Sequence, residues 1–175
     1  MVVRASGADS YVLCELAGTT YALRSDDIEQ LEMIGQITPV PNAPAFVDGL
    51  TSVRGRVIPA VSLRVRFGFE RAPHDLRSRL VVVRADTRSV GLIVDSAREF
   101  ATISEDSIQP PPDGLSDLTS SYLRGMAHLG ERLVLVLDVR ELLRLTDAPA
   151  AALPAATAPG GSSLERSLEF LPAKS

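Results

Sequence analysis

Apolar and polar residues alternate near the start of the chain in the way that is typical of a β-strand. In residues 10–16 the side chains of Val12, Cys14 and Leu16 fall on one face, and this period of two predicts a half-buried strand. A turn that contains glycine follows, and the next apolar run, residues 21–23, completes a predicted hairpin. Cys14 is therefore interpreted as a core thiol.

Glycines and prolines divide the rest of the chain into short predicted elements. Residues 25–27 have the sequence of a capped helical turn. The prolines in residues 37–44 favour a sheet edge or a rigid extended loop, because proline lacks the N–H that a central strand needs. The other predicted elements are strands at 50–53 and 56–61 around Arg54-Gly55, a helix at 62–67 that stops at Gly68, strands at 80–84, 89–94, 122–129 and 132–137, and a helix at 139–145.

The second half of the chain repeats the pattern of the first. Residues 49–63 and residues 125–139, which lie 76 positions later, have the same order of glycines and apolar runs. A duplicated β-rich half predicts a mainly β fold with two similar small barrels. A surface with two related lobes suits an adaptor better than a catalyst.

The composition of the chain changes near Thr146, where alanine, proline and glycine begin to dominate. We expect an N-terminal tail at residues 1–9, one domain at residues 10–146 and a flexible C-terminal tail at residues 147–175. Three leucines in this tail have helical spacing, so a short helix at 163–171 is the alternative to a disordered tail.

Cysteine content and hydropathy indicate the cellular location of the protein. The chain has 175 residues, a formal net charge of -4 and one cysteine, which cannot form a disulfide within the chain. The N-terminal residues lack the long apolar segment of a secretion signal, so a cytoplasmic location is expected. No apolar run is long enough to span a bilayer, and membrane association is expected only indirectly, through a partner.

Arginine accounts for 17 of the 18 basic residues, and seven arginines lie within residues 54–79 together with only Glu70 and Asp75. This stretch leaves an alternative function open, that of an Arg-rich β-barrel which binds nucleic acid. The overall acidity of the chain and its lack of tryptophan argue against that alternative. A protein partner is favoured, and no nucleic-acid partner is expected.

No residue pattern in the sequence predicts catalysis, a metal site or a cofactor. His74 and His128 lie outside any ligand spacing, and the chain has neither a glycine-rich phosphate loop nor a nucleophile elbow. Carboxylates such as Asp95 and Glu99 are interpreted as turn and surface residues. An enzyme is therefore not expected.

One ordered set of motifs resembles a known family. The proline-rich residues 37–44 lead through Phe46-Val47-Asp48-Gly49 to the Val53-Arg54-Gly55 turn, and related runs follow at 90–95, 108–112 and 122–125. Together these motifs resemble the CheW family of bacterial chemotaxis coupling proteins over about residues 10–145. The chain departs from the usual motifs at three positions, Gln30, Ser52 and Ser62.

The resemblance implies two five-stranded β-barrels with short helices. It also implies a non-enzymatic adaptor that couples the cytoplasmic tips of methyl-accepting chemoreceptors to a CheA-type histidine kinase. By the same resemblance, receptor binding is expected at Ile28, Gln30, Val53, Arg54 and Gly55. The candidates for kinase contact are the rigid extended positions Thr38, Pro39, Val40, Gln109 and Pro110.

Overall fold

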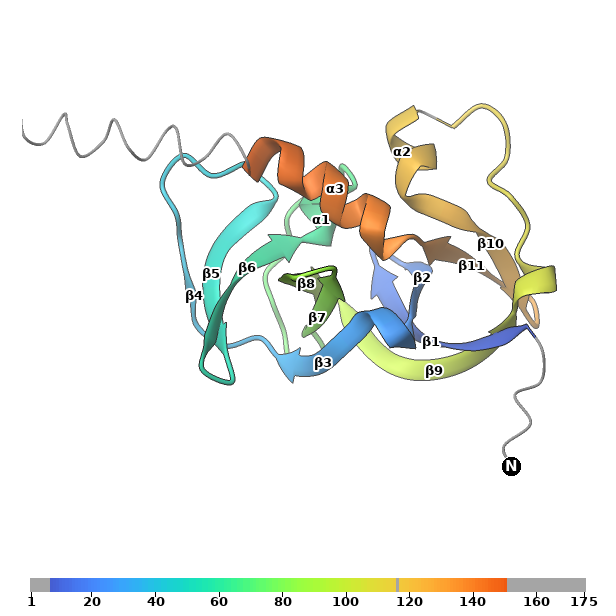
Figure 1. Cartoon of the computed structure of the whole chain (residues 1–175), viewed down its shortest axis with the longest axis horizontal. Helices are drawn as coiled ribbons and strands as arrows, with labels where there is room; N and C mark the ends of the chain where they lie inside the picture. Colours follow the sequence, from blue (N-terminus) through green and yellow to red (C-terminus); the bar gives the residue numbers. More distant parts are fainter. Residues whose placement is uncertain (1–6, 116, 151–175) are drawn as a thin grey trace, which may run out of the picture.

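The structure, a computed structural model, describes residues 7–115 and 117–150 of the chain. It is mainly β, and its strands curve into two lobes that lie side by side (Figure 1). The elements in chain order are β1 (Ala8–Leu16), β2 (Thr19–Arg24), the 3₁₀ turn η1 (Ser25–Asp27), β3 (Ile28–Met33), β4 (Ile37–Thr38), β5 (Val47–Val53), β6 (Arg56–Ser62), α1 (Leu63–Arg66), β7 (Arg79–Ala85), β8 (Arg88–Val94), β9 (Ser96–Ser104), the 3₁₀ turn η2 (Glu105–Ser107), α2 (Asp117–Tyr122), β10 (Leu123–Leu129), β11 (Arg132–Leu137) and α3 (Val139–Ala150).

The strands form two sheets, which confirms the predicted mainly β fold with two subdomains. The five-stranded sheet has the order β10-β11-β2-β1-β9, and the six-stranded sheet has the order β3-β7-β8-β6-β5-β4. The sixth strand, β4, is only two residues long. Without β4 the two sheets have the same strand number.

Each sheet takes strands from both halves of the chain. The β1–β2 hairpin pairs with β9 and β11 from the second half, whereas the β7–β8 hairpin pairs with β3 and β6 from the first half. Of these four pairings between the halves, β11 with β2 and β6 with β8 are parallel, whereas β1 with β9 and β3 with β7 are antiparallel. The sequence repeat predicts two lobes. The observed strand pairing shows that the two halves of the chain exchange their first hairpins, β1–β2 and β7–β8, between these lobes.

Two glycines at equivalent positions of the repeat allow the proline-rich segments to lie against the sheets. A Cβ on Gly49 would lie 2.1 Å from the carbonyl oxygen of Thr38, and a Cβ on Gly125 would lie 2.3 Å from that of Gln109. Only glycine permits so close a backbone approach. The first segment therefore pairs with β5 as the edge strand β4, as the prolines predict, and Gln109 forms a bridge with Met126.

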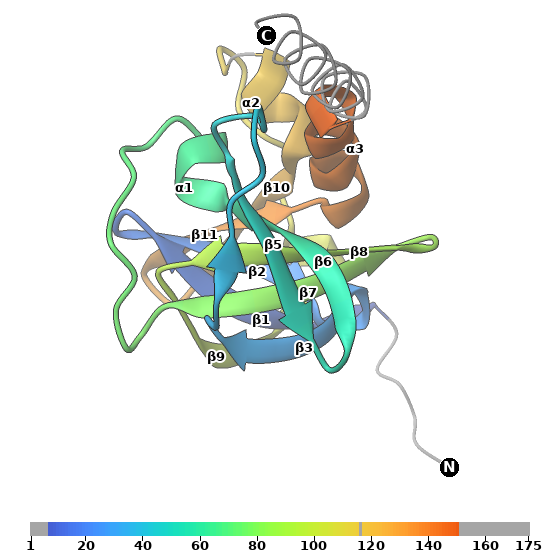
Figure 2. The same cartoon turned by 90° about the vertical axis from the view of Figure 1, so that its left-hand side faces the viewer.

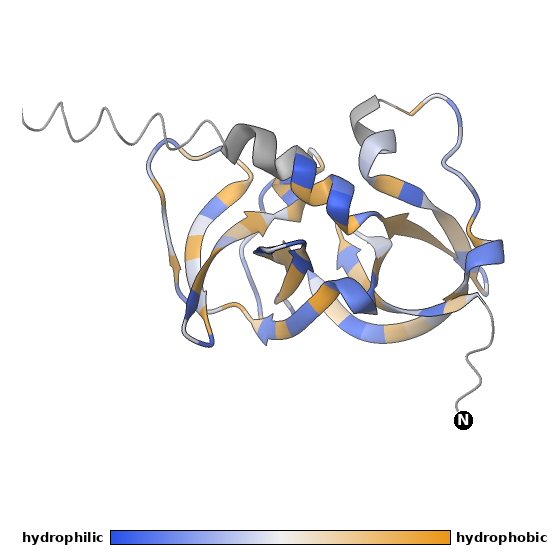
Figure 3. Cartoon of the chain, in the orientation of Figure 1, coloured by the Kyte–Doolittle hydropathy of each residue, from blue (hydrophilic) through white to orange (hydrophobic). Residues whose placement is uncertain are grey.

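The largest hydrophobic cluster joins the two sheets and α3. Val12, Cys14 and Leu16 lie in this cluster as predicted, and Cys14 is only 1% exposed. Burial raises the pKa of the Cys14 thiol to about 12, so the thiol stays protonated near neutral pH. The expectation of a half-buried strand is wrong, however, because Tyr11 and Leu13 on the other face of β1 are buried in a second cluster. Figure 3 shows the apolar residues alternating with polar ones along the outer strands.

Capping groups define the helices that cover this core. The hydroxyl of Ser62 accepts a hydrogen bond from the N–H of Val65 at the start of α1, and Asp138 accepts one from the N–H of Glu141 at the start of α3. Helix α3 lies along one side of both sheets, next to α2 (Figure 2). It continues to Ala150, beyond the predicted end at 145, and α2 itself was not predicted.

The strands β3 and β9 also lack a counterpart among the sequence predictions, which placed only a helical turn before Ile28. The predicted helical turn is present as η1, but the predicted cap is wrong, because no side chain caps the start of this turn. The expected domain boundary at Thr146 stays a prediction, and the possible helix at 163–171 lies outside the described residues.

Candidate protein-interaction site

The Arg54-Gly55 turn presents an arginine on a rigid hairpin. Both turn residues have positive φ, 47° for Arg54 and 80° for Gly55, the pattern of a two-residue turn that matches the twist of β5 and β6. The Arg54 side chain is 74% exposed. Val53 is buried in one hydrophobic cluster with Ile58 and Leu80, and this packing holds the base of the hairpin against the sheet. The turn thus holds its guanidinium in solvent on a fixed base.

An ion pair connects this hairpin to β3. The Nε atom of Arg54 lies 3.6 Å from Oε1 of Glu32, whose side chain is 34% exposed. Glu32 lies 22 positions before Arg54, and no local sequence pattern relates the two residues, so this pair could not be predicted from the sequence. The pair brings the hairpin next to the strand that carries the other two candidate receptor residues, as Figure 2 shows.

Those two residues, Ile28 and Gln30, differ in their surroundings. Ile28 is half-buried against the main core. Gln30 is also half-buried, and among the described residues its amide oxygen Oε1 is a buried acceptor without a hydrogen-bond partner. A buried acceptor that lacks a donor is unfavourable in the isolated protein. The structure thus brings all five candidate receptor residues to β3 and the adjoining hairpin turn.

A second set of polar contacts on β3 was also missed by sequence reasoning. The carboxylate of Glu29 lies 2.8 Å from a guanidinium nitrogen of Arg56, and it accepts a hydrogen bond from the hydroxyl of Ser89 at 3.1 Å. Arg84 lies 3.4 Å from its other oxygen. The hydrogen bond from Arg56 is the main cause that lowers the pKa of Glu29, against the effect of burial.

The candidate kinase-contact residues lie at two opposite ends of the molecule. Thr38 and Pro39 are exposed and Val40 is half-buried at the β4 edge of the six-stranded sheet. Gln109 and Pro110 are exposed beyond η2, beside β10 of the other sheet. Figure 1 shows β4 and η2 at opposite ends of the long axis. These five residues therefore form two separate surfaces and not one patch.

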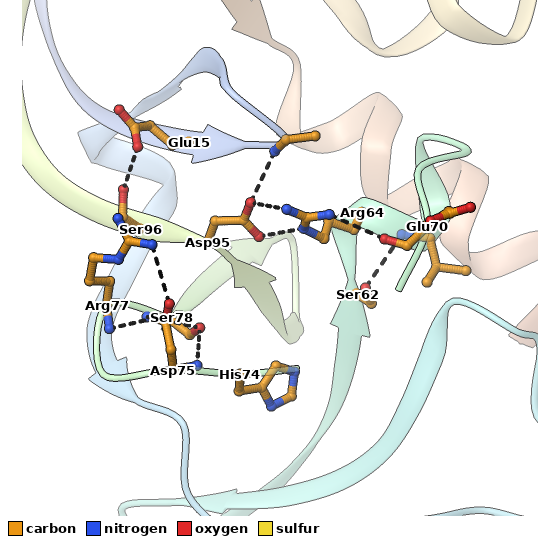
Figure 4. A network of polar contacts seen from close by, with 12 residues as sticks. Glu15, Ser62, Arg64, Glu70, His74, Asp75, Arg77, Ser78, Asp95 and Ser96 are labelled. Carbon is orange, nitrogen blue, oxygen red and sulfur yellow. Dashed lines mark hydrogen bonds and ion pairs between the residues drawn. The ribbon is translucent and has the colours of Figure 1, made fainter. Parts of the chain in front are cut away.

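Asp95 connects α1 to the β1–β2 turn through hydrogen bonds, close to where the two sheets meet. Its oxygens accept two hydrogen bonds of 2.7 Å from Arg64 at the start of α1, and one of 3.0 Å from the N–H of Ala17 in the β1–β2 turn (Figure 4). Burial would raise the pKa of Asp95, but the hydrogen bonds from Arg64 and Ala17 lower it overall. This carboxylate is held in the charged form by structural partners, which agrees with its interpretation as a turn residue.

Most arginines in residues 54–79, the stretch that suggested nucleic-acid binding, form ion pairs within the protein. Acidic partners lie beside five of its seven arginines, four of them from outside the stretch: Arg54 with Glu32, Arg56 with Glu29, Arg64 with Asp95, Arg71 with Asp48 and, within the stretch, Arg77 with Asp75. Arg66 lies 5.0 Å above the ring of Phe46. A surface that collects phosphate groups needs uncompensated positive charge, and this arrangement provides little of it.

No group of three or more potential metal-ligating side chains occurs among the described side chains, those of residues 7–115 and 120–144. In the same part of the chain, no helix has the length and apolar character needed to cross a membrane.

Comparisons with known proteins identify the family. The family model described as "CheW-like domain" matches residues 10–147. The chain is 28% identical over 133 residues to the chemotaxis protein CheW of Klebsiella aerogenes, a match that covers 76% of this chain and 80% of that protein. It is 34% identical over 117 residues to the chemotaxis protein CheW of Helicobacter pylori, covering 67% of this chain and 70% of that protein.

The fold has a counterpart among solved structures. The crystal structure of the scaffolding protein TtCheW from Thermoanaerobacter tengcongensis matches with a TM-score of 0.71 and 27% identity, and the match covers 79% of this chain and 90% of that one. Fold and relatives together define an adaptor, or scaffold, of chemotaxis signalling. The chain belongs to the CheW family. Nothing in the comparisons supports the nucleic-acid alternative.

Proposed function

We propose that this adaptor couples the cytoplasmic tips of methyl-accepting chemoreceptors to a CheA-type histidine kinase, and that it does so in the cytoplasm without catalysing a reaction. The observation that carries the receptor half of the proposal is the exposed Arg54 on its rigid turn beside β3. A guanidinium binds carboxylates through two parallel hydrogen bonds, so an acidic or amide side chain of a receptor helix is a suitable partner.

Reversing the charge at Arg54 tests the receptor contact. Arg54→Glu places a carboxylate beside Glu32 and removes the guanidinium, so we expect much weaker binding to a receptor-tip fragment in a pull-down or by fluorescence anisotropy. Arg77→Glu is the matched control, because Arg77 is 67% exposed and also has an acidic neighbour, Asp75, at 3.3 Å. Both variants should unfold within about 0.5 kcal/mol of wild type, as exposed positions usually do. Equal receptor binding by the two variants would exclude Arg54 as a contact.

The kinase half of the proposal assigns contact to the two rigid edges. Prolines restrict the backbone of these segments, so their ordering on binding costs little. Two different surfaces at opposite ends of one molecule suit head-to-tail assembly with a partner of related shape. The alternative explanation is that the prolines only prevent edge-to-edge aggregation. It predicts that a substitution at the edge does not weaken kinase binding.

Val40→Asp distinguishes these explanations. The charge lies at the β4 edge, so we expect weaker binding to the regulatory domain of the kinase, with receptor binding retained. Leu76→Asp is the control, because Leu76 is an apolar side chain that is 81% exposed on the connector between α1 and β7. If Val40→Asp and Leu76→Asp bind the kinase equally well, the edge is not a contact.

The same assay tests the nucleic-acid alternative. Mixing the protein with kinase and receptor fragments at two salt concentrations, beside a DNA and an RNA control, separates the two functions. Phosphate binding falls steeply with added salt because counterions are released. We expect binding to the protein fragments and none to either nucleic acid.

A further inference from the structure

The carboxylate of Glu29 connects four strands at one end of the six-stranded sheet. Glu29 itself lies on β3, Arg84 on β7, Ser89 on β8 and Arg56 on β6, and these strands are consecutive neighbours in the sheet. Arg84 and Ser89 face each other in the β7–β8 pairing. Glu29 thus lies at one end of a row of polar side chains that crosses the sheet beside the Arg54-Gly55 turn.

A bulge in β3 places Glu29 in this row. Ile28 pairs with Val83 and Gln30 pairs with Val82, so Glu29 is the additional residue that has no partner of its own on β7. A bulge redirects the side chain of the extra residue and bends the strand locally. The side chain of Glu29 is only 20% exposed, whereas those of Arg56 and Arg84 are 51% and 56% exposed. The carboxylate is the inner member of the network.

Glu29 also stands between the two segments that carry the candidate receptor residues. It is flanked in sequence by Ile28 and Gln30, and its main partner, Arg56, directly follows Gly55. The Arg54 and Glu32 side chains provide a second link, but that pair is longer, at 3.6 Å, and the arginine is more exposed. A shorter pair with a less exposed carboxylate is screened less by solvent and salt. The contact between Glu29 and Arg56 is therefore the firmer link between strand and hairpin.

We propose that Glu29 is a positioning residue for receptor binding: its ion pair with Arg56 fixes the hairpin turn relative to β3. The inference rests on the proposed function, and it assigns Glu29 no contact with the receptor. The depressed pKa of Glu29 agrees with a carboxylate that is charged and bonded in the folded protein.

A double-mutant cycle tests this inference. Glu29→Gln keeps the size of the side chain and removes its charge, and Arg56→Gln removes the partner. We expect each variant to bind a soluble receptor-tip fragment about two- to fivefold more weakly, the change that corresponds to a partly exposed ion pair. The double variant should bind no more weakly than the weaker single variant, because both changes remove the same link.

An equivalent ion pair in the other lobe supplies the matched control. Arg132 lies 76 positions after Arg56, and its guanidinium lies 2.7 Å from the carboxylate of Glu99 on β9. Glu99→Gln makes the same chemical change far from the candidate receptor site. It should leave receptor binding at the wild-type value, and all the variants should bind the kinase domain and unfold in urea like wild type.

The other possible results show whether the positioning role of Glu29 or the proposed function is wrong. If wild type binds the receptor fragment and Glu29→Gln binds it equally well, the positioning role is wrong and the proposed function stands. Equal losses in receptor and kinase binding with lower stability would show a general structural role and overturn the inference. Additive losses in the double variant would show independent contacts, which also contradicts it. If wild type itself does not bind the receptor fragment, the proposed function fails, and the inference fails with it.

Discussion

Replacing Gly49 by alanine should detach the β4 edge from its sheet. The new Cβ would lie 2.1 Å from the carbonyl oxygen of Thr38 and 2.6 Å from its carbonyl carbon. Ordinary contacts between carbon and a carbonyl oxygen are about 3.3 Å or longer, so the edge must move by about 1 Å. The φ of +148° at Gly49 adds strain for any side chain.

The size of the effect follows from these two causes. Loss of the short β4 pairing removes about two hydrogen bonds at roughly 0.5–1.5 kcal/mol each. Backbone strain adds about 1–2 kcal/mol, and the total is about 2–5 kcal/mol. Gly18→Ala is the control, because Gly18 has a φ of +82° and a Cβ there would meet nothing within 4 Å. That variant should lose only the strain, about 1–2 kcal/mol.

Thermal unfolding distinguishes the two variants. In a domain of this size each kcal/mol lowers Tm by about 2–4 °C, so Gly49→Ala should melt roughly 2–12 °C below Gly18→Ala. Binding to the kinase should also weaken in Gly49→Ala, because Thr38 and its neighbours are displaced, while receptor binding is retained. Equal melting temperatures for the two alanine variants would refute the clash argument.

Three further predictions concern other parts of the fold. Asp95→Asn should lower the stability measured by urea unfolding at pH 7, because Arg64 and Ala17 lose a charged acceptor. A depressed folded pKa stabilises the protein above the ordinary value of 3.8, so the difference from wild type should shrink as the pH falls below 3.8 and should persist between pH 5 and 7. Gln30→Leu should raise stability by about 1 kcal/mol in the same assay, because a buried acceptor without a partner is removed; lower stability would show that the amide is satisfied. Truncation after Ala150 should leave Tm and kinase binding near wild type, since an Ala/Pro/Gly-rich segment contributes little to a core, and a large loss of either would place the tail within the domain.

The features that the sequence predicts well are those with local causes. The turn at Arg54-Gly55, the end of the short helix before Gly68 and the burial of Cys14 each follow from a few neighbouring residues, and the structure contains all three. The ordered motifs predict the family for a related reason, because their order along the chain is kept even where residues such as Ser52 differ.

The features that the sequence missed depend on partners far along the chain. Strand β3 mixes apolar and polar residues without strict alternation, and its pairing partner, β7, lies about fifty residues later. Its bulge at Glu29 interrupts the period of two that would reveal a strand. The pairs of Arg54 with Glu32 and of Arg56 with Glu29 follow from that pairing, so neither could be predicted before the register of β3 was known. The exchange of hairpins between halves is hidden for the same reason.

The exchanged hairpins determine the order in which the chain completes its fold during synthesis. The β1–β2 hairpin is made first, but its neighbours β9 and β11 are made last, more than 70 residues later. At roughly 5–20 residues per second, the ribosome needs roughly 6–23 s to proceed from the end of β2 to the end of β11. During that interval the apolar β1–β2 hairpin lacks at least one of the strands that pair with its edges, and an unpaired strand edge can pair with another chain. A ribosome stalled within the second half would therefore hold an aggregation-prone intermediate, whereas completion of β11 supplies the last strand of the five-stranded sheet.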